Sequence, residues 1–555
     1  MWFIIYFIIL KYFYIIREKY SLFIHFSVFS IQERKMDPRI FDYLMLVLFA
    51  GAMIAIAIVT RNRSKSVNDF LLAGKKGLNG WMSAFSYGTT YFSAVIFIGY
   101  AGNFGKQFGL SAVWIGVANA IIGGLFAWLV LAKRTKNMTS ALESKTMPDF
   151  FEKRYDSKNL KLVSAFIVFI FLIPYSASVY NGLSSLFEAL FGIYGYGWVI
   201  CLALAILTAL YLFFGGYFAT AVSDFVQGII MLVGVIVMVI LFMAKEPVSW
   251  DISSLTESVT HSWFTTDKGN MPWIYDNTTS LLALIMLTSF GVWALPQTVH
   301  KYYAIRDKKA IMQGTVVSTV FALIVGFVAY FVGALSPIFV ENGLISAGLA
   351  GDKIIPAMLV KIIPYGLMGL IAVLILSASM STLASVSLAS ASVVAVDIYK
   401  GRINKSAEDK RVNITMKVMC LVFVAISVIL AILNEKFNIA AIAYLMGISW
   451  GTLAGCFMGP FVLGLLWKRT TKAGAWASII SSLSLTAFLV VFLGYHKNGF
   501  SCDFGTAIKT GVSVSPLIGV ICMISSVIVT VVVSLLTKPP KKETIDKAFS
   551  KKVIE

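Results

Sequence analysis

Charged side chains are scarce in this sequence of 555 residues, since Asp, Glu, Lys and Arg together make up 13% of it. Hydrophobic residues make up 58%, and the mean hydropathy is +0.83. A soluble chain of this length needs many more charged and polar groups to cover its surface. The composition therefore excludes a water-soluble protein and indicates that a lipid bilayer surrounds most of the chain.

Histidine and cysteine are also rare, with four and five copies. The cysteines are scattered and form no Cys-X-X-Cys pair, which argues against a disulfide framework and against a zinc site. The histidines fall in loops, at the ends of hydrophobic runs or before residue 36, so no deep acid–base centre is indicated. A polytopic membrane enzyme is disfavoured for this reason, and a channel because no ring of charges or filter-like repeat is visible.

Long hydrophobic runs are abundant. Runs of at least about 18 nearly uncharged residues recur along the chain, and each can cross about 30 Å of hydrocarbon as a helix. The sequence therefore predicts an all-α, polytopic membrane protein of about 13 transmembrane helices. The predicted spans are 41–60, 81–104, 112–132, 162–188, 195–214, 221–244, 279–300, 313–337, 363–398, 414–433, 439–466, 474–496 and 512–536.

Lysine and arginine alternate between the two sides of these spans. If the chain from Met36 starts outside, the inner loops hold 32 of the 46 basic residues, including the groups Lys301 to Lys309 and Lys538 to Lys552. Because cytoplasmic loops collect Lys and Arg, this pattern predicts a cell-membrane protein with its N-terminus outside and its C-terminus in the cytoplasm. The net charge of +19 then reflects the membrane and not nucleic acid.

The two ends of the chain differ from the rest. Residues 1–35 fit a signal-like segment, an interfacial segment or translation from an upstream start, because Met36 begins a more ordinary lead-in. The basic tail from residue 538 fits either contact with anionic lipid or a solvated end. The predicted units are an atypical extension (1–35), a first peripheral helix with its loop (36–80), a first half of core helices 1–5 (81–244), an extracellular loop (245–278), a second half of core helices 6–10 (279–466), two peripheral helices (467–537) and the tail (538–555).

Asp224 is the clearest carboxylate inside a predicted span, since it lies early in span 221–244. An unpaired charge there costs at least roughly 3 kcal/mol, so this side chain should face the bundle interior and have a partner. Two interpretations fit. Asp224 either takes part in ion binding or serves as a structural cap or snorkelling residue at the cytoplasmic end of the span.

Hydroxyl groups line one helix between residues 377 and 392. Within it, positions 378, 381, 382 and 385 follow i, i+3, i+4, i+7 spacing, so their side chains share one face. Hard cations such as sodium prefer several oxygen ligands, which hydroxyls and freed backbone carbonyls can supply. The stripe thus predicts an ion site. Close helix packing is the other interpretation, because small residues and hydroxyls are common at membrane helix interfaces.

Two spans carry residues that interrupt helices. Span 81–104 combines glycines with a run of hydroxyls, and span 279–300 contains Gly291 and Pro296. Unwound helices at membrane depth expose carbonyls to an ion and a half-helix N-terminus to a solute. The two spans lie five apart, which predicts an inverted repeat of five plus five core helices. Glycine-rich packing is the alternative for either span.

Four stretches make the chain similar to the solute:sodium symporter family, from about residue 41 to its end. They are residues 89–99, which resemble the first core helix of the family; Gly215 and Gly216 with residues 221–227, which resemble the fifth; residues 380–385 and 396–400, which resemble the eighth; and residues 461–471 with Gly474, which resemble its late signature. The resemblance implies a leucine-transporter-type fold with ten core helices in two inverted halves, one span before them and two after.

The resemblance also implies a sodium site between the first and eighth core helices. Its ligands would be the carbonyls of Thr89, Phe92 and Ala378 and the hydroxyls of Ser381 and Thr382. Some members bind a second sodium ion, which here would use Asp224, Ser381 and Ser385. Ala384 replaces a hydroxyl that some of those members have. Na+ is the only metal expected.

The resemblance implies that the solute is a small organic anion or zwitterion. Sugar-carrying members resemble one another in having Asn-Ile-Ser-Ala-Glu-Gln where this chain has residues 91–96, Tyr-Phe-Ser-Ala-Val-Ile, so the Glu and Gln are missing. No arginine lies in the predicted core spans to clamp a carboxylate, which leaves helix ends and hydroxyls. The candidate lining residues, each of which also fits a packing role, are Thr90, Ser93, Tyr180, Asn181, Ser289, Trp293, Gln297 and Tyr444.

The predicted function is therefore sodium-coupled secondary active symport by alternating access, with a small solute, the sodium ion and the lipid bilayer as partners. A proton-coupled or uncoupled carrier of the same fold is the alternative, with Asp224 titrating instead of binding sodium.

Overall fold

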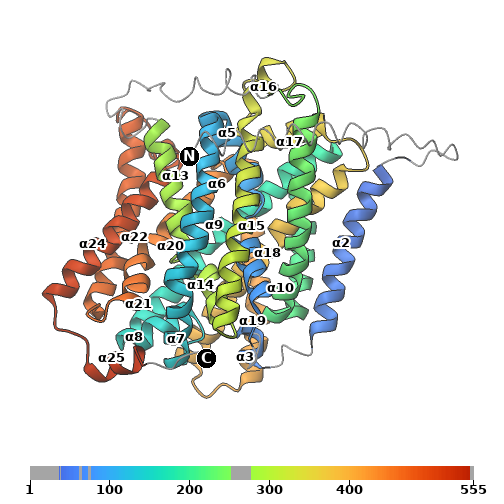
Figure 1. Cartoon of the computed structure of the whole chain (residues 1–555). Helices are drawn as coiled ribbons and strands as arrows, with labels where there is room; N and C mark the ends of the chain where they lie inside the picture. Colours follow the sequence, from blue (N-terminus) through green and yellow to red (C-terminus); the bar gives the residue numbers. More distant parts are fainter. Residues whose placement is uncertain (1–36, 38, 62–65, 73–76, 252–276, 551–555) are drawn as a thin grey trace, which may run out of the picture.

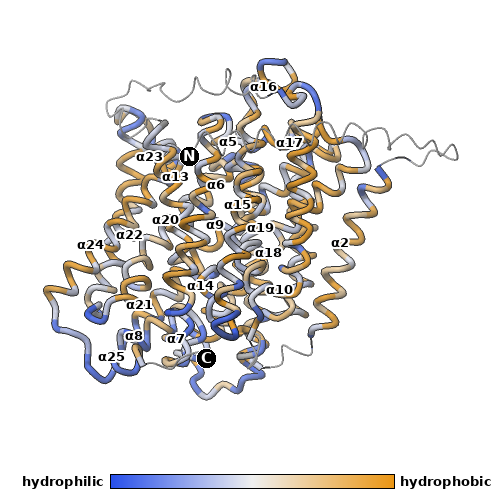
Figure 2. Tube along the Cα trace, in the orientation of Figure 1, coloured by the Kyte–Doolittle hydropathy of each residue, from blue (hydrophilic) through white to orange (hydrophobic). Residues whose placement is uncertain are grey.

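The structure is a computed structural model that describes residues 37, 39–61, 66–72, 77–251 and 277–550. The atypical extension 1–35 and most of the predicted extracellular loop lie outside the described residues. The described part of the chain is a bundle of helices and contains no β-sheet (Figure 1). Hydrophobic residues form its middle and hydrophilic residues gather at both ends, as a membrane protein requires (Figure 2).

The first half of the chain contains the following helices: α2 (Arg39–Thr60), α3 (Val67–Leu72), α4 (Gly80–Tyr91), η3 (Val95–Tyr100), α5 (Ala101–Phe108), η4 (Gly109–Ala112), α6 (Val113–Ala118), η5 (Asn119–Phe126), η6 (Trp128–Ala132), α7 (Lys133–Ala141), α8 (Met147–Tyr155), α9 (Lys158–Phe191) and α10 (Gly197–Ala244).

The second half contains α13 (Asn277–Gly291), α14 (Pro296–Tyr303), α15 (Lys308–Ala334), α16 (Ser336–Glu341), α17 (Gly351–Ile362), α18 (Met368–Ser392), η8 (Val393–Ile403), α19 (Asp409–Phe437), α20 (Ile442–Phe457), η9 (Met458–Leu463), α21 (Gly464–Leu466), α22 (Lys472–Lys497), α23 (Phe504–Ser513), α24 (Ser515–Leu536) and α25 (Lys542–Ala548).

Within the described residues, 11 helical segments are long and apolar enough to cross a membrane. The predicted spans 195–214 and 221–244 correspond to the two parts of α10, which are separated by a kink at Gly216, where the backbone is not helical. Gly216 has φ 72°, a left-handed conformation that side chains other than glycine rarely adopt. The protein is thus an all-α, multi-pass membrane protein, while the count of thirteen, the inverted repeat and the orientation of the termini stay predictions.

Burial separates the centre of the bundle from its periphery. The most apolar window of α18 and η8 is 94% buried, whereas that of α2 is 17% buried. In Figure 1, α2 stands at one side of the bundle and α22 and α24 at the other. The hydroxyl-lined helix is therefore in the middle, where its polar groups contact protein and not lipid.

Both helices that the sequence predicts to be interrupted are broken. Asn79 caps the start of α4 by accepting a hydrogen bond from the Met82 N–H, and α4 ends at Tyr91, so that residues 92 and 93 are not helical. The second break separates α13 from α14, and Pro296 begins α14, where its missing N–H costs no hydrogen bond. Each break lies among buried residues and leaves backbone polar groups available for a ligand.

Candidate functional site

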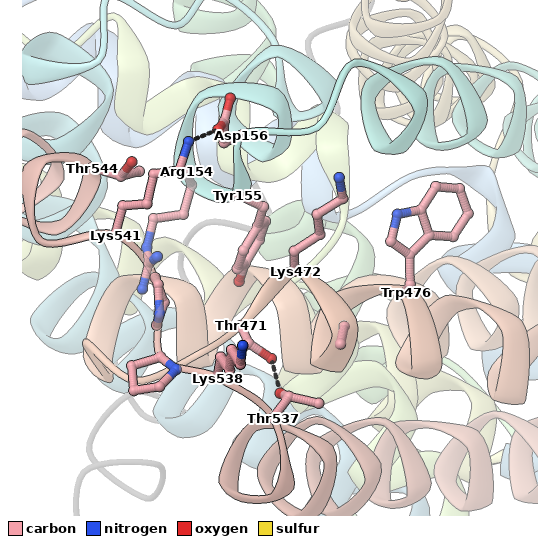
Figure 3. Close-up of a pocket in the computed structure, with 13 residues that line it drawn as sticks. Arg154, Tyr155, Asp156, Thr471, Lys472, Trp476, Thr537, Lys538, Lys541 and Thr544 are labelled. Carbon is pink, nitrogen blue, oxygen red and sulfur yellow. Dashed lines mark hydrogen bonds and ion pairs between the residues drawn. The ribbon is translucent and has the colours of Figure 1, made fainter.

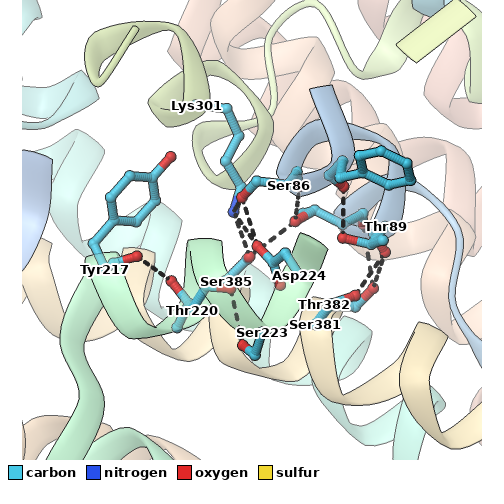
Figure 4. A network of polar contacts seen from close by, with 12 residues as sticks. Ser86, Thr89, Tyr217, Thr220, Ser223, Asp224, Lys301, Ser381, Thr382 and Ser385 are labelled. Atoms are coloured by element: carbon cyan, nitrogen blue, oxygen red, sulfur yellow. Dashed lines mark hydrogen bonds and ion pairs between the residues drawn. The ribbon is translucent and has the colours of Figure 1, made fainter. Parts of the chain in front are cut away.

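The helices α4 and α18 bring four predicted sodium ligands together near the first break, and Figure 4 shows three of them, Thr89, Ser381 and Thr382. The hydroxyl of Ser381 donates to the carbonyl oxygen of Thr89 at 2.8 Å and contacts that of Ala378 at 3.1 Å. The hydroxyl of Thr382 lies 3.4 Å from the Thr89 oxygen and 3.1 Å from the Ala378 oxygen. All four residues are buried. We call Thr89, Ala378, Ser381 and Thr382 the neutral cluster.

Phe92, the fifth predicted ligand, lies at the end of α4. Its backbone is extended, with φ −107° and ψ 121°, so its carbonyl leaves the ladder of helical hydrogen bonds. The break is held against α18 because the N–H of Ala94 donates to the Ser379 hydroxyl at 3.1 Å. Two carbonyls and two hydroxyls with no net charge, next to a further freed carbonyl, form an oxygen-rich set suited to one alkali ion.

A second group of polar side chains lies one helical turn away between the same two helices. The hydroxyl of Ser86 donates to Asp224 Oδ2 at 2.5 Å. The Lys301 ammonium donates to the hydroxyls of Ser86 and Ser385, both at 2.8 Å, and lies 3.5 Å from Asp224 Oδ2. We call Ser86, Asp224, Lys301 and Ser385 the charged cluster (Figure 4). The Thr90 hydroxyl, 2.9 Å from that of Ser385, connects it to the first break.

Lys301 corrects the sequence analysis, which counts it among the cations of a cytoplasmic loop. In the structure, α14 continues to Tyr303, and the Lys301 side chain is 1% exposed. Asp224, on the kinked helix α10, is fully buried and has this lysine as its partner. The sequence therefore foresees a partner for Asp224 but does not identify it.

Five of the predicted solute-lining residues lie at or beside the breaks. Ser93 is in the first break and Trp293 in the second. Trp293 donates from Nε1 to the Ile122 carbonyl at 3.1 Å, and Ser289 donates to Asn119 Oδ1 at 3.0 Å. The remaining two are Thr90, in α4, and Gln297, whose buried Oε1 has no hydrogen-bond partner among the described residues.

The other three predicted lining residues lie in α9 and α20. Asn181 in α9 donates to the Ala431 carbonyl at 2.8 Å and accepts from Asn434 at 3.0 Å, so its amide joins α9 to α19. Tyr444 in α20 packs edge-on against Phe104, with ring centroids 6.4 Å apart. Tyr180 is fully buried in α9, and its hydroxyl has no hydrogen-bond partner in the described part of the chain.

Aromatic residues that the sequence analysis did not select surround the breaks. The Tyr91 hydroxyl donates to the Thr288 carbonyl at 2.6 Å and so joins the end of α4 to α13. The Tyr91 ring stacks on Trp450 at 6.2 Å, and Tyr175 meets Trp450 edge-on at 5.5 Å. The Tyr175 hydroxyl lies near Ser93 and Thr382. Spacing in the sequence does not reveal these aromatic residues as a group, because they come from three different helices, α4, α9 and α20.

A cavity of about 500 Å³ lies away from both clusters, where the end of α8, the start of α22 and residues 537–544 meet (Figure 3). Its lining is basic, with Arg154, Lys472, Lys538 and Lys541. Part of the predicted tail forms α25, which packs on α8, and Lys541 pairs with Asp156 at 3.1 Å. The cavity shares no lining residue with the predicted sodium or solute sites.

A bundle with two interrupted helices and buried oxygen clusters beside the first break is typical of a secondary transporter of leucine-transporter-type fold, not of an enzyme. A family model described as the sodium:solute symporter family matches residues 70–481, and the chain belongs to that family. It is accordingly a sodium-coupled symporter of a small solute in the membrane.

Curated relatives and a solved structure are similar over nearly the whole chain. The osmoregulated proline transporter OpuE of Bacillus subtilis (strain 168) is 27% identical over 511 residues, which cover 90% of this chain and 95% of the relative. A sodium/proline symporter of Staphylococcus aureus is 26% identical and covers 91% and 95%. The structure of a Na+-coupled sialic acid symporter matches with a TM-score of 0.70 at 19% identity, over 90% and 98% of the two chains.

Proposed function

We propose that this symporter carries a small zwitterionic amino acid, with L-proline as the first candidate. The observation that carries the proposal is the chemistry of the two breaks, residues 92–93 and 292–295, which contain no charged side chain. A solute whose own charges balance needs no fixed counter-charge there. The two curated relatives, named as proline transporters, support the same class of solute.

The helix ends and aromatic rings at the breaks suit the two charges of such a solute. A carboxylate is stabilised at the N-terminal end of a helix such as α14, which begins at the second break. An ammonium group is stabilised by free carbonyls at the end of a helix such as α4 and by the faces of Tyr91 and Trp450. Each interaction uses dipoles or ring faces, so no arginine is needed.

The neutral cluster is the proposed sodium site. Its hydroxyls and carbonyls now bond to one another, and a sodium ion would draw the same oxygens onto itself. Thr382 also contacts the Thr90 carbonyl at 3.2 Å, next to the proposed solute site. Because both sites share the first break, sodium and solute should stabilise one conformation and raise each other's affinity by the same factor. The membrane potential adds about 2.3 kcal/mol per sodium charge per 100 mV.

The test is uptake of radiolabelled L-proline into proteoliposomes holding the purified protein, with an inward gradient of sodium or, as the control, of choline or potassium. Two competitors show which charge of proline is needed for binding: pyrrolidine has only the amine, and cyclopentanecarboxylate has only the carboxylate.

We expect sodium-dependent uptake that excess proline blocks. Pyrrolidine and cyclopentanecarboxylate should each inhibit about 10-fold or more weakly than proline, since each lost charge-assisted hydrogen bond costs at least about 1.5 kcal/mol.

Two outcomes would refute the proposal for the solute. One is sodium-driven uptake of a monocarboxylate such as pyruvate that proline does not inhibit, which would assign an organic anion. The other is inhibition by cyclopentanecarboxylate as strong as that by proline, because the amine would then contribute nothing. Proline uptake that is equally fast in choline would refute the coupling of this solute to sodium.

A further inference from the structure

We propose that the ammonium group of Lys301 is a tethered cation that occupies the position of a second sodium ion, so that the protein binds one sodium ion per chain. The proposal rests on the sodium-coupled function and deepens it by fixing the number of ions. It concerns the charged cluster, where the sequence predicts a second sodium ion between Asp224, Ser381 and Ser385.

The contacts of the ammonium group are those that a bound cation would make. Lys301 Nζ lies 2.8 Å from the hydroxyls of Ser86 and Ser385 and 3.5 Å from Asp224 Oδ2. A lysine ammonium has three N–H donors, which equals the number of these oxygens. The face of Tyr217 lies 5.2 Å from the same nitrogen and adds a cation–π contact. The cation is therefore surrounded by oxygens and an aromatic ring.

Two of the three predicted ligands of the second sodium ion, Asp224 and Ser385, contact Lys301. The third, Ser381, donates instead to the Thr89 carbonyl in the neutral cluster. Ser86 is not among the predicted ligands of the second sodium ion, but its hydroxyl contacts both Asp224 and Lys301. The oxygens that could bind a second ion are thus divided between the neutral cluster and the lysine.

Charge balance gives the same result. Asp224 and Lys301 are both buried and together carry no net charge, so the carboxylate is already neutralised inside the bundle. A sodium ion at this position would add a second positive charge beside the same carboxylate, where low polarity makes repulsion between cations strong. The neutral cluster holds no side-chain cation, so a sodium ion entering there meets no such repulsion.

The four residues of the charged cluster come from four helices, α4, α10, α14 and α18. A mobile ion would join these helices only when sodium is bound, whereas a lysine joins them at every sodium concentration. A covalently attached cation is also not released on the far side of the membrane. The gradient of one sodium ion, and not two, then drives each solute molecule.

The experiment counts bound sodium without any solute, using equilibrium binding of ²²Na+ to purified protein. We expect one sodium ion per chain in the wild type. In Lys301→Met the side chain is uncharged and one atom shorter, which removes the ammonium group, so Asp224 can accept a second ion and the count should rise to two. In Asp224→Asn/Lys301→Met both charges are absent, and the count should return to one.

Lys136→Met is the matched control, because it removes a second lysine close to α14, one that is partly buried. Lys136 donates to the Tyr303 carbonyl at 2.8 Å and has no carboxylate in that contact. We expect this variant to bind one sodium ion, as the wild type does. If Lys301→Met does not fold, the wild-type count still decides, together with the Hill coefficient for sodium activation of transport, which should be 1.

Two ions per wild-type chain, or one ion in a folded Lys301→Met protein, would overturn the proposal. These results leave the proposed solute untouched, because no solute is present. A wild type that binds no sodium would overturn the sodium site itself and this inference with it. A solute other than proline would change neither count, so failure of the solute proposal and failure of this one are distinguishable.

Discussion

The neutral cluster and the charged cluster lie one helical turn apart between α4 and α18, yet they differ in what they can bind. The neutral cluster offers carbonyl and hydroxyl oxygens without a cation, whereas the charged cluster has a carboxylate and a lysine that neutralises it. The same pair of helices can therefore present one exchangeable ion site and one permanently filled position. The difference comes from Lys301, which a third helix, α14, contributes.

The largest expected effect is on sodium binding at the neutral cluster. Ser381→Ala/Thr382→Ala removes two ligands, each worth about 1.5–3 kcal/mol when bonded to a charge, so sodium affinity should fall by about 100-fold or more. Sodium-stimulated uptake in proteoliposomes measures this. Ser390→Ala is the matched control, since it removes another buried hydroxyl of α18, about two helical turns beyond Thr382, that has no hydrogen-bond partner among the described residues. Unchanged sodium dependence in the double variant would assign the ion to other residues.

Next in size is the effect of breaking the ion pair in the charged cluster. Asp224→Asn leaves the Lys301 ammonium buried without its carboxylate, which should lower the free energy of unfolding by about 3–5 kcal/mol. Asp224→Asn/Lys301→Met should recover most of that loss, because no charge remains buried. Thermal unfolding of the purified variants measures both. If Asp224→Asn is as stable as the wild type, the pair does not stabilise the fold and the contrast between the clusters fails.

A smaller effect is expected for Ser385→Ala, which removes one acceptor of Lys301 and the partner of Thr90. Stability should fall by about 1–3 kcal/mol, as for other hydrogen bonds to charged groups. The number of sodium ions bound should not change, since Ser385 contacts the lysine and not the neutral cluster. A loss of sodium binding without a loss of stability would place Ser385 among the ion ligands instead.

The smallest effect concerns Asp352 in α17, a carboxylate that has neutral donors where Asp224 has a lysine. Asn103 donates to one oxygen at 3.0 Å and the Ile442 N–H to the other at 2.9 Å. Burial raises the pKa of Asp352 to about 6, against an ordinary value of 3.8, although these hydrogen bonds oppose the rise.

Because the folded protein holds this proton more tightly than the unfolded chain, the contribution of Asp352 to stability is complete below pH 3.8 and is lost as the pH rises through about 6. The contribution of Asp352 should therefore raise the midpoint temperature of thermal unfolding of the wild type by about 1–2 °C at pH 5 relative to pH 7.5. Asp352→Asn cannot titrate and should lose that part of the difference. A difference of the same size in the variant would assign the pH dependence to other groups.

The sequence is enough to predict that the residues of the neutral cluster lie together, because their placement follows from local chemistry. The spacing of Ala378, Ser381 and Thr382 fixes their common face in any helix, and the family resemblance pairs them with Thr89. Glycine, hydroxyl and proline residues in the two interrupted spans marked the breaks. These features depend on residues close in sequence or on backbone geometry, so they can be found without a structure.

Lys301 and Asn181 show what the sequence could not give. A lysine at the end of a hydrophobic run usually lies in a loop. Here the helical span continues three residues beyond the predicted end at residue 300, to Tyr303, and this places Lys301 inside the bundle. The Asn181 side chain fits a solute contact by residue type, but its amide bonds to α19. In both cases the outcome depends on which distant helix packs beside the residue, and hydrophobic periodicity carries no information about that choice.

The hydrogen bond from the Tyr91 hydroxyl to the Thr288 carbonyl has a mechanical consequence. It connects Tyr91, the last residue of α4, to α13, close to the break in each of the two interrupted helices. Because this hydrogen bond connects the two interrupted helices next to their breaks, bending at one break is expected to be coupled to bending at the other.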